Sequence, residues 1–340
     1  MMAGSVTLAL PGSASAATWQ LTSAQAVVVP DSATDAWGVG PSSDGYNGRI
    51  AEVSHLSGTT WSTLTVPDSA NAAVAADSPT DVWAVGGSSA AHYDGSKWTA
   101  YTVPVAPGSF APSLRSVAIV SPTDVWAAGP NQNVAAGLAL QHWDGTKWSQ
   151  VTAPVPAGAS YAGVGVHGLS ASGGDLWVLA SATVGPNYDT EYFTARWDGT
   201  RWSLSVVPTA QGQQPTNISA ASATDAWVAG NDYTGFAMHY NGSTWSTFRM
   251  PAATGQLDTV NSIAARGDEA WAVGTSQDSG SVSHAAVWHW DGSTWSSVGF
   301  PVTSGNTSAQ TVSYVPGSNT VWIEADDPST ATGLVLAVGG

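Results

Sequence analysis

A short motif of the form Asp-x-Trp recurs along the whole chain of 340 residues and constrains the fold more than any other feature. Adjacent copies lie about 43 to 51 residues apart, with some variation at the acidic position. A period of this length indicates a repeat architecture in which each unit packs against its neighbours. The seven copies end in Trp37, Trp83, Trp126, Trp177, Trp227, Trp271 and Trp322.

A second motif, Asp-Gly-x-x-Trp, alternates with the first one. Asp-Gly between two apolar runs is a strong signal for a tight hairpin turn, so each copy is expected to join two antiparallel strands. Each copy leads into a short segment that a proline ends. The six copies, in which Asn or Ser sometimes replaces Asp, end in Trp61, Trp98, Trp148, Trp202, Trp245 and Trp295.

Each period has room for four short strands. In the period 113–154, strands are expected over 114–120, 125–129, 138–143 and 147–153. Only 9% of the residues are charged, and the chain is rich in Gly and Trp, which favours strands over helices. Four antiparallel strands in a period of this length are typical of a β-propeller blade, so the sequence predicts an all-β fold.

The seven motif copies predict a seven-bladed β-propeller over residues 17–340, and the two chain ends suggest how it closes. The seventh period offers a third strand at 333–338 and then the chain stops. The missing fourth strand resembles the segment around Trp19 at the other end. We therefore expect the last blade to be closed by the N-terminal strand, which would cover an otherwise open sheet edge.

Residues 1–16 resemble an incomplete secretory signal peptide. A short apolar run at 6–10 precedes Ala14-Ser15-Ala16, which fits a cleavage site, but the basic residues expected at the start are missing. An ordinary N-terminal tail is the alternative interpretation. No apolar run reaches the ~18–20 residues of a membrane span. The sequence therefore predicts a secreted, extracellular protein without a membrane span.

The charge balance excludes some partners. Lys and Arg number 8 against 24 Asp and Glu, which gives a formal net charge of −16. Phosphate contacts need clustered basic residues, so we expect no nucleic-acid partner. The absence of Cys excludes a disulfide framework, a thiolate metal site and a Cys nucleophile. No pattern points to a cofactor or a metal, and no loop has the ligand spacing of a calcium site.

The two motifs together resemble those of secreted bacterial propeller lectins. The D-G-x-x-W turn is similar to the W-D-G-x-x-W strands of these lectins, and to the Asp-box of sialidase-like propellers with one residue fewer between Asp and Gly. Within this group the chain looks most like the propeller lectin subunits of the "umbrella" antibacterial toxin particles. That resemblance implies binding to cell-surface glycans and to other subunits of a secreted toxin complex, and it carries over no ligand residue.

One repeat position holds a histidine in most periods. A metal set is excluded, because equivalent positions of different blades lie beyond ligand distance. A sugar pocket in each blade is one alternative, and the other is that the ring packs while a nitrogen bonds the neighbouring turn. We interpret the position as a packing position. It is occupied by His55, His92, His142, His239 and His289, with Arg196 in the fourth period.

Function is better sought where the repeats differ, in the unequal loops after the second and fourth strands. These loops are rich in Gly, Ser and Asn and carry Tyr and Asp, which suit a polar ligand: an aromatic ring stacks on a sugar face while a carboxylate accepts hydroxyl hydrogen bonds. Solvated loops without a ligand are the alternative. The predicted ligand-binding residues are Tyr46, Phe110, Tyr188, Asp189, Asp232 and Tyr233.

Enzyme chemistry finds little support, so we favour a module without catalytic residues. The chain lacks the G-x-S-x-G and H-E-x-x-H motifs. Asp189 and Glu191 form a conceivable glycosidase pair, and Tyr161 with His167 conceivable lyase bases. Three function classes therefore stay open: a glycan-binding module that possibly docks to a toxin complex, a protein–protein scaffold, and a polysaccharide lyase or glycoside hydrolase.

Overall fold

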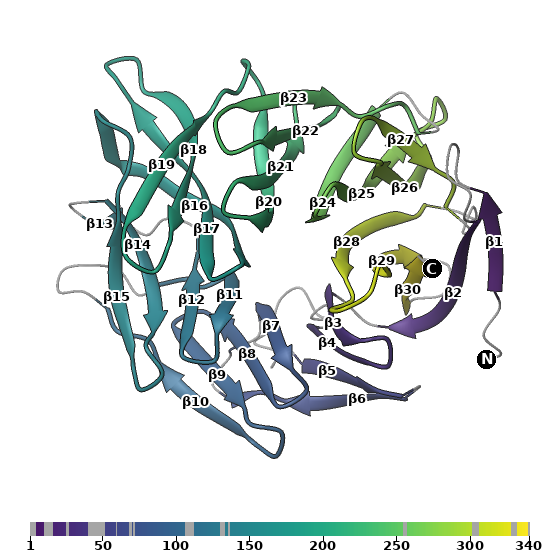
Figure 1. The fold of residues 1–340 in the computed structure, drawn as a ribbon, viewed down its shortest axis with the longest axis horizontal. Helices are drawn as coiled ribbons and strands as arrows, with labels where there is room; N and C mark the ends of the chain where they lie inside the picture. The colour runs from purple at the N-terminus through teal and green to yellow at the C-terminus, as the bar shows by residue number, and fades with distance from the viewer. Residues whose placement is uncertain are drawn as a thin grey trace. The chain divides into compact units, whose positions relative to one another are not determined.

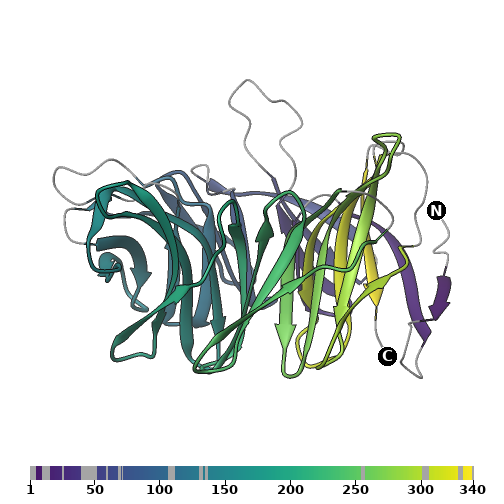
Figure 2. The same ribbon diagram turned by 90° about the horizontal axis from the view of Figure 1, so that it is seen from above.

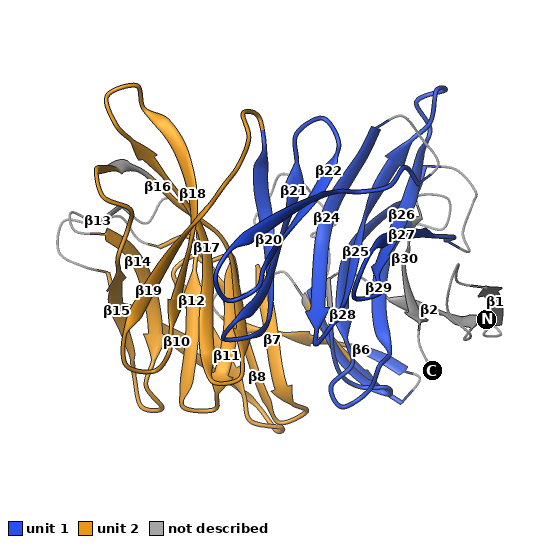
Figure 3. Ribbon diagram, turned by 45° about the horizontal axis from the view of Figure 1, so that its top comes forward, with its two compact units in different colours: residues 1–40, 56–61, 213–340 blue, residues 41–55, 62–212 orange. Residues whose placement is uncertain are grey.

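The computed structural model describes residues 5–9, 16–24, 27–39, 52–58, 60–67, 70, 72–105, 112–129, 133–134, 137–253, 257–300, 306–327 and 332–338. The numbered elements in these ranges are all β-strands, arranged in seven sheets whose neighbouring strands run antiparallel (Figure 1). In the described ranges no helix has the length and apolar character needed to cross a membrane. The chain divides into two compact units, which are described separately (Figure 3).

The unit that comprises residues 41–55 and 62–212 contains three complete sheets. The period 113–154, for which four strands were predicted, forms one of these sheets. Its variable loop contains one additional strand of two residues, Asn133–Val134. The strands are β7 (Ala73–Ser78), β8 (Asp81–Gly86), β9 (Ser89–Tyr93), β10 (Trp98–Thr102); β11 (Ser116–Ser121), β12 (Asp124–Ala128), β13 (Asn133–Val134), β14 (Gly137–Trp143), β15 (Trp148–Ala153); β16 (Ala159–Ser172), β17 (Asp175–Val184), β18 (Asp189–Trp197) and β19 (Trp202–Val207).

The other unit comprises residues 1–40, 56–61 and 213–340, and a seventh sheet, β3 to β6, takes residues from both units. The strands are β20 (Gln214–Ser222), β21 (Asp225–Asn231), β22 (Gly235–Tyr240), β23 (Trp245–Arg249); β24 (Leu257–Arg266), β25 (Glu269–Gln277), β26 (Ser283–Trp290), β27 (Trp295–Val298); β28 (Ser308–Tyr314), β29 (Val321–Asp327), β30 (Thr332–Val338), β2 (Ala16–Ala24), β1 (Ser5–Ala9); and β3 (Val27–Ser32), β4 (Asp35–Val39), β5 (Glu52–Ser57), β6 (Thr60–Thr65).

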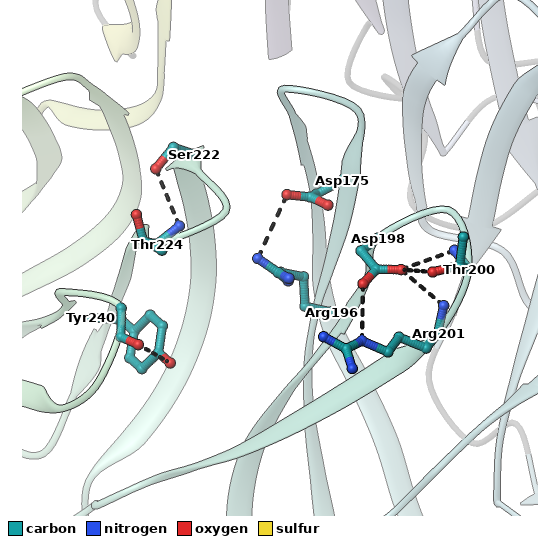
Figure 4. Close-up of polar contacts among 9 residues, drawn as sticks. Asp175, Arg196, Asp198, Thr200, Arg201, Ser222, Thr224 and Tyr240 are labelled. Carbon is teal, nitrogen blue, oxygen red and sulfur yellow. Dashed lines mark hydrogen bonds and ion pairs between the residues drawn. The ribbon is translucent and has the colours of Figure 1, made fainter.

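The Asp-Gly motif forms the turn between the third and fourth strands of a sheet. In the turn after β18, Oδ1 of Asp198 accepts hydrogen bonds from the backbone N–H of Thr200 and Arg201, both at 2.9 Å, and from the Thr200 hydroxyl at 2.6 Å (Figure 4). Asp94, Asp144 and Asp291 repeat these three contacts. The carboxylate thus satisfies the backbone donors of a tight turn, which is why the motif recurs.

The glycine of this turn is required by space as well as by backbone conformation. Gly145 has a φ of 88°, and a Cβ atom added there would lie 2.9 Å from Thr123 Cβ of the preceding turn. Side chains rarely adopt such a φ, because the Cβ atom crowds the following carbonyl. The Asp-Gly turn therefore packs against the turn between the first and second strands of the same sheet.

The tryptophans of the Asp-x-Trp motif pack one sheet against the next. Trp126 of β12 is buried, and its ring lies 6.4 Å and 5.7 Å from the rings of Trp197 and Trp202, centroid to centroid. The same arrangement joins Trp83 to the pair Trp143 and Trp148 in this unit. It also joins Trp227 to Trp290 and Trp295 in the other unit. Rings at these distances contribute beyond the apolar area that they bury.

Side chains also connect the first strands of neighbouring sheets. In the unit that contains β20 to β30, Asn217 Oδ1 accepts the Ile263 N–H at 3.2 Å, and Ser219 Oγ accepts the Ala265 N–H at 2.9 Å. Ser262 Oγ in turn accepts the Val312 N–H at 3.3 Å. These bonds satisfy backbone donors that the sheets leave unpaired, so small polar residues are needed on the first strands.

The predicted pairing of the two chain ends is present. β2 pairs antiparallel with β30, for example Gln20 with Ala337, and the purple N-terminal strands lie beside the yellow C-terminal ones in Figures 1 and 2. β1 adds a further strand on the outer edge of β2. Signal-peptide cleavage after Ala16 would remove β1, and this cleavage stays a prediction. The count of seven blades also stays a prediction.

Candidate functional site: the loops between second and third strands

The repeated histidine is a packing residue in three sheets. His142 stacks on Trp126 with 4.2 Å between ring centroids, and its Nε2 lies 2.9 Å from Asp124 Oδ1 at the start of the same strand as that tryptophan. His92 makes the same contacts with Trp83 and Asp81, and His239 with Trp227 and Asp225. The packing interpretation is confirmed at these positions, because stacking and hydrogen bonding take up the ring.

Two periods vary this stack. The Arg196 guanidinium lies over the Trp177 ring. It is 3.7 Å from the Asp175 carboxylate (Figure 4). His289 lies 4.3 Å from the Trp271 ring, and burial lowers the pKa of this histidine. A cation over an indole face makes a favourable contact, so Arg196 is a physical substitute for the stacked histidine.

The loops between second and third strands are the places where the backbone departs from ordinary conformations. Among the described residues, three non-glycine residues have a positive φ: Tyr188 with 58°, Tyr233 with 93° and Ser281 with 62°. Each lies in such a loop, in three successive sheets. A positive φ is costly for a residue with a side chain, and such positions cluster at functional sites.

The loop between β21 and β22 holds Tyr233 outward. The side chain is 90% exposed, while the neighbouring Asp232 carboxylate is largely covered and binds the Arg249 guanidinium from β23. Arg249 also donates to the Thr234 hydroxyl at 3.1 Å, and its proximity lowers the pKa of Asp232. Asp232 therefore shapes this loop, and sequence reasoning missed its partner Arg249 because that residue lies on β23, one hairpin further along the chain.

The loop between β25 and β26 closes around Asp278. Its Oδ1 accepts the N–H groups of Gly280 at 2.8 Å and Val282 at 2.9 Å, and its Oδ2 lies 3.2 Å from His284 Nε2. These hydrogen bonds, the one from Val282 first, lower the pKa of Asp278. The carboxylate thus fixes the turn in which Ser281 has its positive φ.

In the other unit, the loop between β17 and β18 presents Tyr188. Its side chain is 76% exposed, and its N–H donates to the Gly185 carbonyl at 3.4 Å. Asp189 follows as the first residue of β18 and is also exposed. Four predicted site residues are thus described, two in each unit, whereas Tyr46 and Phe110 lie outside the described residues. Their role in ligand binding stays a prediction.

A further group of polar residues lies on the first strands, and His167 alone among them was a candidate from the sequence. The first strands β16, β20, β24 and β28 each contain a register shift that leaves a single polar residue without a partner in the pairing, and β16 and β20 have a second shift elsewhere. Such bulges change the direction of a side chain and often lie next to binding sites. The four residues at these positions are His167, Thr216, Asn261 and Gln310.

His167, a conceivable lyase base, is the titratable side chain among these four residues. Its Nε2 lies 2.9 Å from Ser181 Oγ, its ring centroid is 5.4 Å from that of Tyr192, and burial lowers its pKa. The Tyr161 side chain lies outside the described ones. In the described part of the chain, no three His, Cys, Asp or Glu residues are arranged to hold a metal ion.

Comparison with known proteins identifies the class of fold. No family model and no curated protein matches the chain. Among solved structures, "YCF48 bound to D1 peptide" is 15% identical, with a TM-score of 0.59 over 98% of this chain and 100% of that one. YCF48 from Cyanidioschyzon merolae is 14% identical, with a TM-score of 0.59 over 98% of each chain. The Myceliophteria thermophila Cps50 (Swd1) beta-propeller domain is 11% identical, with a TM-score of 0.57 over 94% of this chain and 97% of that one.

Together with the sheets described above, this similarity defines an all-β β-propeller with four-stranded antiparallel blades. At these identities the similarity shows the fold alone, and propellers serve unrelated functions.

Proposed function

We propose that this chain is a non-catalytic recognition module that binds glycans with the loops between the second and third strands of its blades. The observation that carries the proposal is the pair of exposed tyrosines, Tyr188 and Tyr233, at positive φ. Strained backbone positions cluster at functional sites, and an exposed tyrosine ring can stack on the apolar face of a sugar.

The proposal extends to the place of action. The chain works outside the cell after removal of residues 1–16, and it docks to a larger secreted antibacterial toxin complex of the kind that its motifs resemble. The net charge of −16 supports a partner that is neutral or basic rather than one rich in phosphate.

A polypeptide is the second candidate ligand. One solved propeller of similar fold is described as bound to a peptide, and exposed tyrosines serve protein recognition as well as glycan recognition. The two ligands differ in what the loops must offer. A sugar needs an aromatic face and hydroxyl partners, whereas a peptide also needs matched backbone donors and acceptors.

The test is a glycan array probed with the full chain. We expect the double variant Tyr188→Ala/Tyr233→Ala to bind on the order of 30-fold more weakly, from about 1 kcal/mol for each lost stack. Tyr188→Trp/Tyr233→Trp should retain binding, because it keeps the aromatic faces. The matched control is Lys97→Ala/Lys147→Ala, which alters exposed residues of two Asp-Gly turns and should bind as the wild type does.

Three results would count against this proposal. Undiminished binding by the tyrosine-to-alanine variant would remove the tyrosines from the site, and loss of binding by the lysine control would move the site to the Asp-Gly turns. A chain that binds no glycan but retains a secreted polypeptide through Tyr188 and Tyr233 would establish the second candidate.

A further inference from the structure

The sheet β16–β19 carries an aromatic residue at a position where the next three sheets carry glycine or alanine. Tyr192 of β18 is paired with Ser181, the fourth residue after the motif tryptophan of β17. In the next three sheets, the residues paired with the fourth residue after that tryptophan are Gly235, Ala285 and Gly333. The tyrosine therefore adds a half-buried ring on the hairpin whose loop presents Tyr188.

The bulge in β16 brings His167 to this tyrosine. His167 is the residue that the register shift leaves without a partner in the pairing, and it keeps an exposed surface. Its ring centroid lies 5.4 Å from that of Tyr192, and its Nε2 lies 2.9 Å from Ser181 Oγ. The strands β16, β17 and β18 lie side by side in one unit (Figure 3), so three adjacent strands each contribute one side chain to a single cluster.

A glycine leaves open space beside the cluster. Gly165 of β16 is paired with Ser181, and a Cβ atom added to Gly165 would meet one heavy atom of the described residues within 4 Å, Ser181 Oγ at 3.9 Å. The next three sheets carry a longer side chain at this position, in Gln214, Thr259 and Ser308. The missing side chain leaves room for a ligand atom next to the Ser181 hydroxyl.

The same face of the sheet continues towards the loop with hydroxyl groups. Thr183 is paired with Thr190, one step of the pattern beyond the pair of Ser181 with Tyr192. Paired residues, and residues two apart on a strand, share a face, so these four side chains lie on one face of the hairpin. Tyr188 follows in the loop, four residues before Tyr192, which corresponds to roughly 13 Å of extended strand.

The hydrogen-bonding capacity of the His167–Ser181 pair matches hydroxyl groups. Partial burial lowers the pKa of His167, which favours the neutral ring at pH 7, with one nitrogen as donor and the other as acceptor. Whichever partner donates in the hydrogen bond between them, the pair keeps one donor and one acceptor for a ligand. A hydroxyl group is both donor and acceptor, whereas an ammonium group offers donors alone and a carboxylate acceptors alone. Neutral sugar hydroxyls therefore fit the pair best.

We propose that His167, Ser181 and Tyr192 form a subsite for adjacent hydroxyl groups of a sugar unit, and that the ligand of this sheet is a neutral oligosaccharide. The inference rests on the proposed glycan recognition and names the class of glycan. Tyr188 contacts one unit of the sugar chain, and the subsite contacts another unit further along the same hairpin. His167 thereby serves as a hydrogen-bonding group for the ligand and not as a base.

An array of neutral and charged glycans, from monosaccharides to oligosaccharides, tests the subsite with the full chain. We expect neutral oligosaccharides to bind more tightly than the matching monosaccharides and than charged chains. His167→Ala and Tyr192→Ala should each weaken oligosaccharide binding on the order of tenfold and leave monosaccharide binding unchanged. His167→Gln should retain more binding than His167→Ala, because an amide keeps a donor and an acceptor.

The last sheet offers a matched control. Gln310, the bulged residue of β28, donates from Nε2 to Asp326 Oδ2 at 2.9 Å, and Gly333 takes the place of the tyrosine there. Gln310→Ala therefore removes an equivalent bond within one sheet but no proposed ligand contact. It should bind oligosaccharides as the wild type does.

Nuclear magnetic resonance of the histidine rings provides a readout that a purely structural role would not change. The tightest neutral oligosaccharide on the array should shift the ring signals of His167, which are identified by their loss in His167→Gln. Circular dichroism of every variant confirms that weaker binding is measured on a folded chain.

The outcomes separate this subsite from the proposed function. Undiminished oligosaccharide binding by His167→Ala and Tyr192→Ala, with binding still lost in Tyr188→Ala, would overturn the subsite and leave glycan recognition standing. A chain that binds no glycan would overturn both. Tighter binding of charged chains would contradict the neutral class of ligand, and release of unsaturated sugars by the wild type would make His167 a base.

Discussion

Antiparallel strands are connected by uniform turns at one end of the blades and by variable loops at the other end. At the Asp-Gly end, Asp94, Asp144, Asp198 and Asp291 make the same three hydrogen bonds. At the other end, Asp232 binds an arginine, Asp278 binds backbone N–H groups and a histidine, and Tyr188 and Tyr233 stand exposed.

The difference shows where the sequence is free to vary. The uniform end satisfies its own backbone within four residues and packs against a neighbouring turn, so loss of its Asp or Gly affects folding. The variable end places strained residues in solvent, where they contribute little to stability and are available for a ligand. Substitutions at the two ends should therefore separate stability from binding.

The largest effect is expected for Trp126→Ala. This tryptophan is buried, its Nε1 lies 2.5 Å from Asp124 Oδ1, and it stacks on His142. Truncation leaves a cavity, removes the hydrogen-bond donor of Asp124 and removes the ring on which His142 stacks. We therefore expect the free energy of unfolding to fall by about 3–5 kcal/mol. Chemical denaturation measures this loss, and Tyr188→Ala as the comparison should change stability by less than about 0.5 kcal/mol. Similar losses for both would erase the distinction between the two ends.

One repeat position breaks the uniform pattern inside the core. The second residue after the motif tryptophan is apolar and buried in six periods, where it is Val39, Val85, Ala128, Leu179, Ala229 and Val273. In the seventh period it is Glu324, which is 3% exposed and whose Oε2 has no hydrogen-bond partner among the described residues. Burial, with the nearby Asp326 as a smaller cause, raises the pKa of Glu324 from 4.5 to about 7.

The second prediction follows from that pKa. Between pH 4.5 and 7 the unfolded chain releases the Glu324 proton while the folded chain keeps it. The free energy of unfolding therefore falls as the pH rises through this window, by on the order of 3 kcal/mol, and the loss is complete above it. Glu324→Gln and Glu324→Val should each remove this contribution and raise the melting temperature at pH 8 more than at pH 5. Equal shifts at both pH values would show that Glu324 does not titrate in this window.

The smallest effect concerns strain in the variable loop. Tyr233 has a φ of 93°, which glycine adopts without cost and alanine does not. Tyr233→Gly should therefore be more stable than Tyr233→Ala by about 1 kcal/mol, while both lose the proposed glycan contact. Denaturation midpoints of the two variants measure the difference. If the glycine variant is no more stable than the alanine variant, the loop adopts a relaxed conformation in solution.

Much of the fold could be predicted because its signals are local. The Asp-Gly turns, the spacing of the motif tryptophans and the pairing of the segment around Trp19 with 333–338 all follow from turn chemistry and periodicity. The stacked histidines were also interpreted correctly, since a ring at one fixed repeat position must serve the blade. The count of seven blades goes beyond what the described strands establish.

The features missed from the sequence depend on contacts between distant residues. Arg249 reaches Asp232 from another strand, and the bulged residues Asn261 and Gln310 become distinct only once the strand register is known. Glu324 is visible in the sequence, but its burial is not. Periodicity indicates which positions of the repeats are equivalent. Where one repeat has a different residue at such a position, as at Glu324, only the three-dimensional structure shows what surrounds that residue.

The pairing of β2 with β30 has a consequence for how the chain reaches its native state. Gln20 is translated long before its partner Ala337, so this sheet cannot be completed until all the residues between them have been synthesised. Joining such distant segments carries the largest loop-closure entropy in the chain, and long-range pairings of this kind fold slowly. The last blade is therefore expected to be the rate-limiting element of folding, and β2 must remain competent for pairing while all the other blades form.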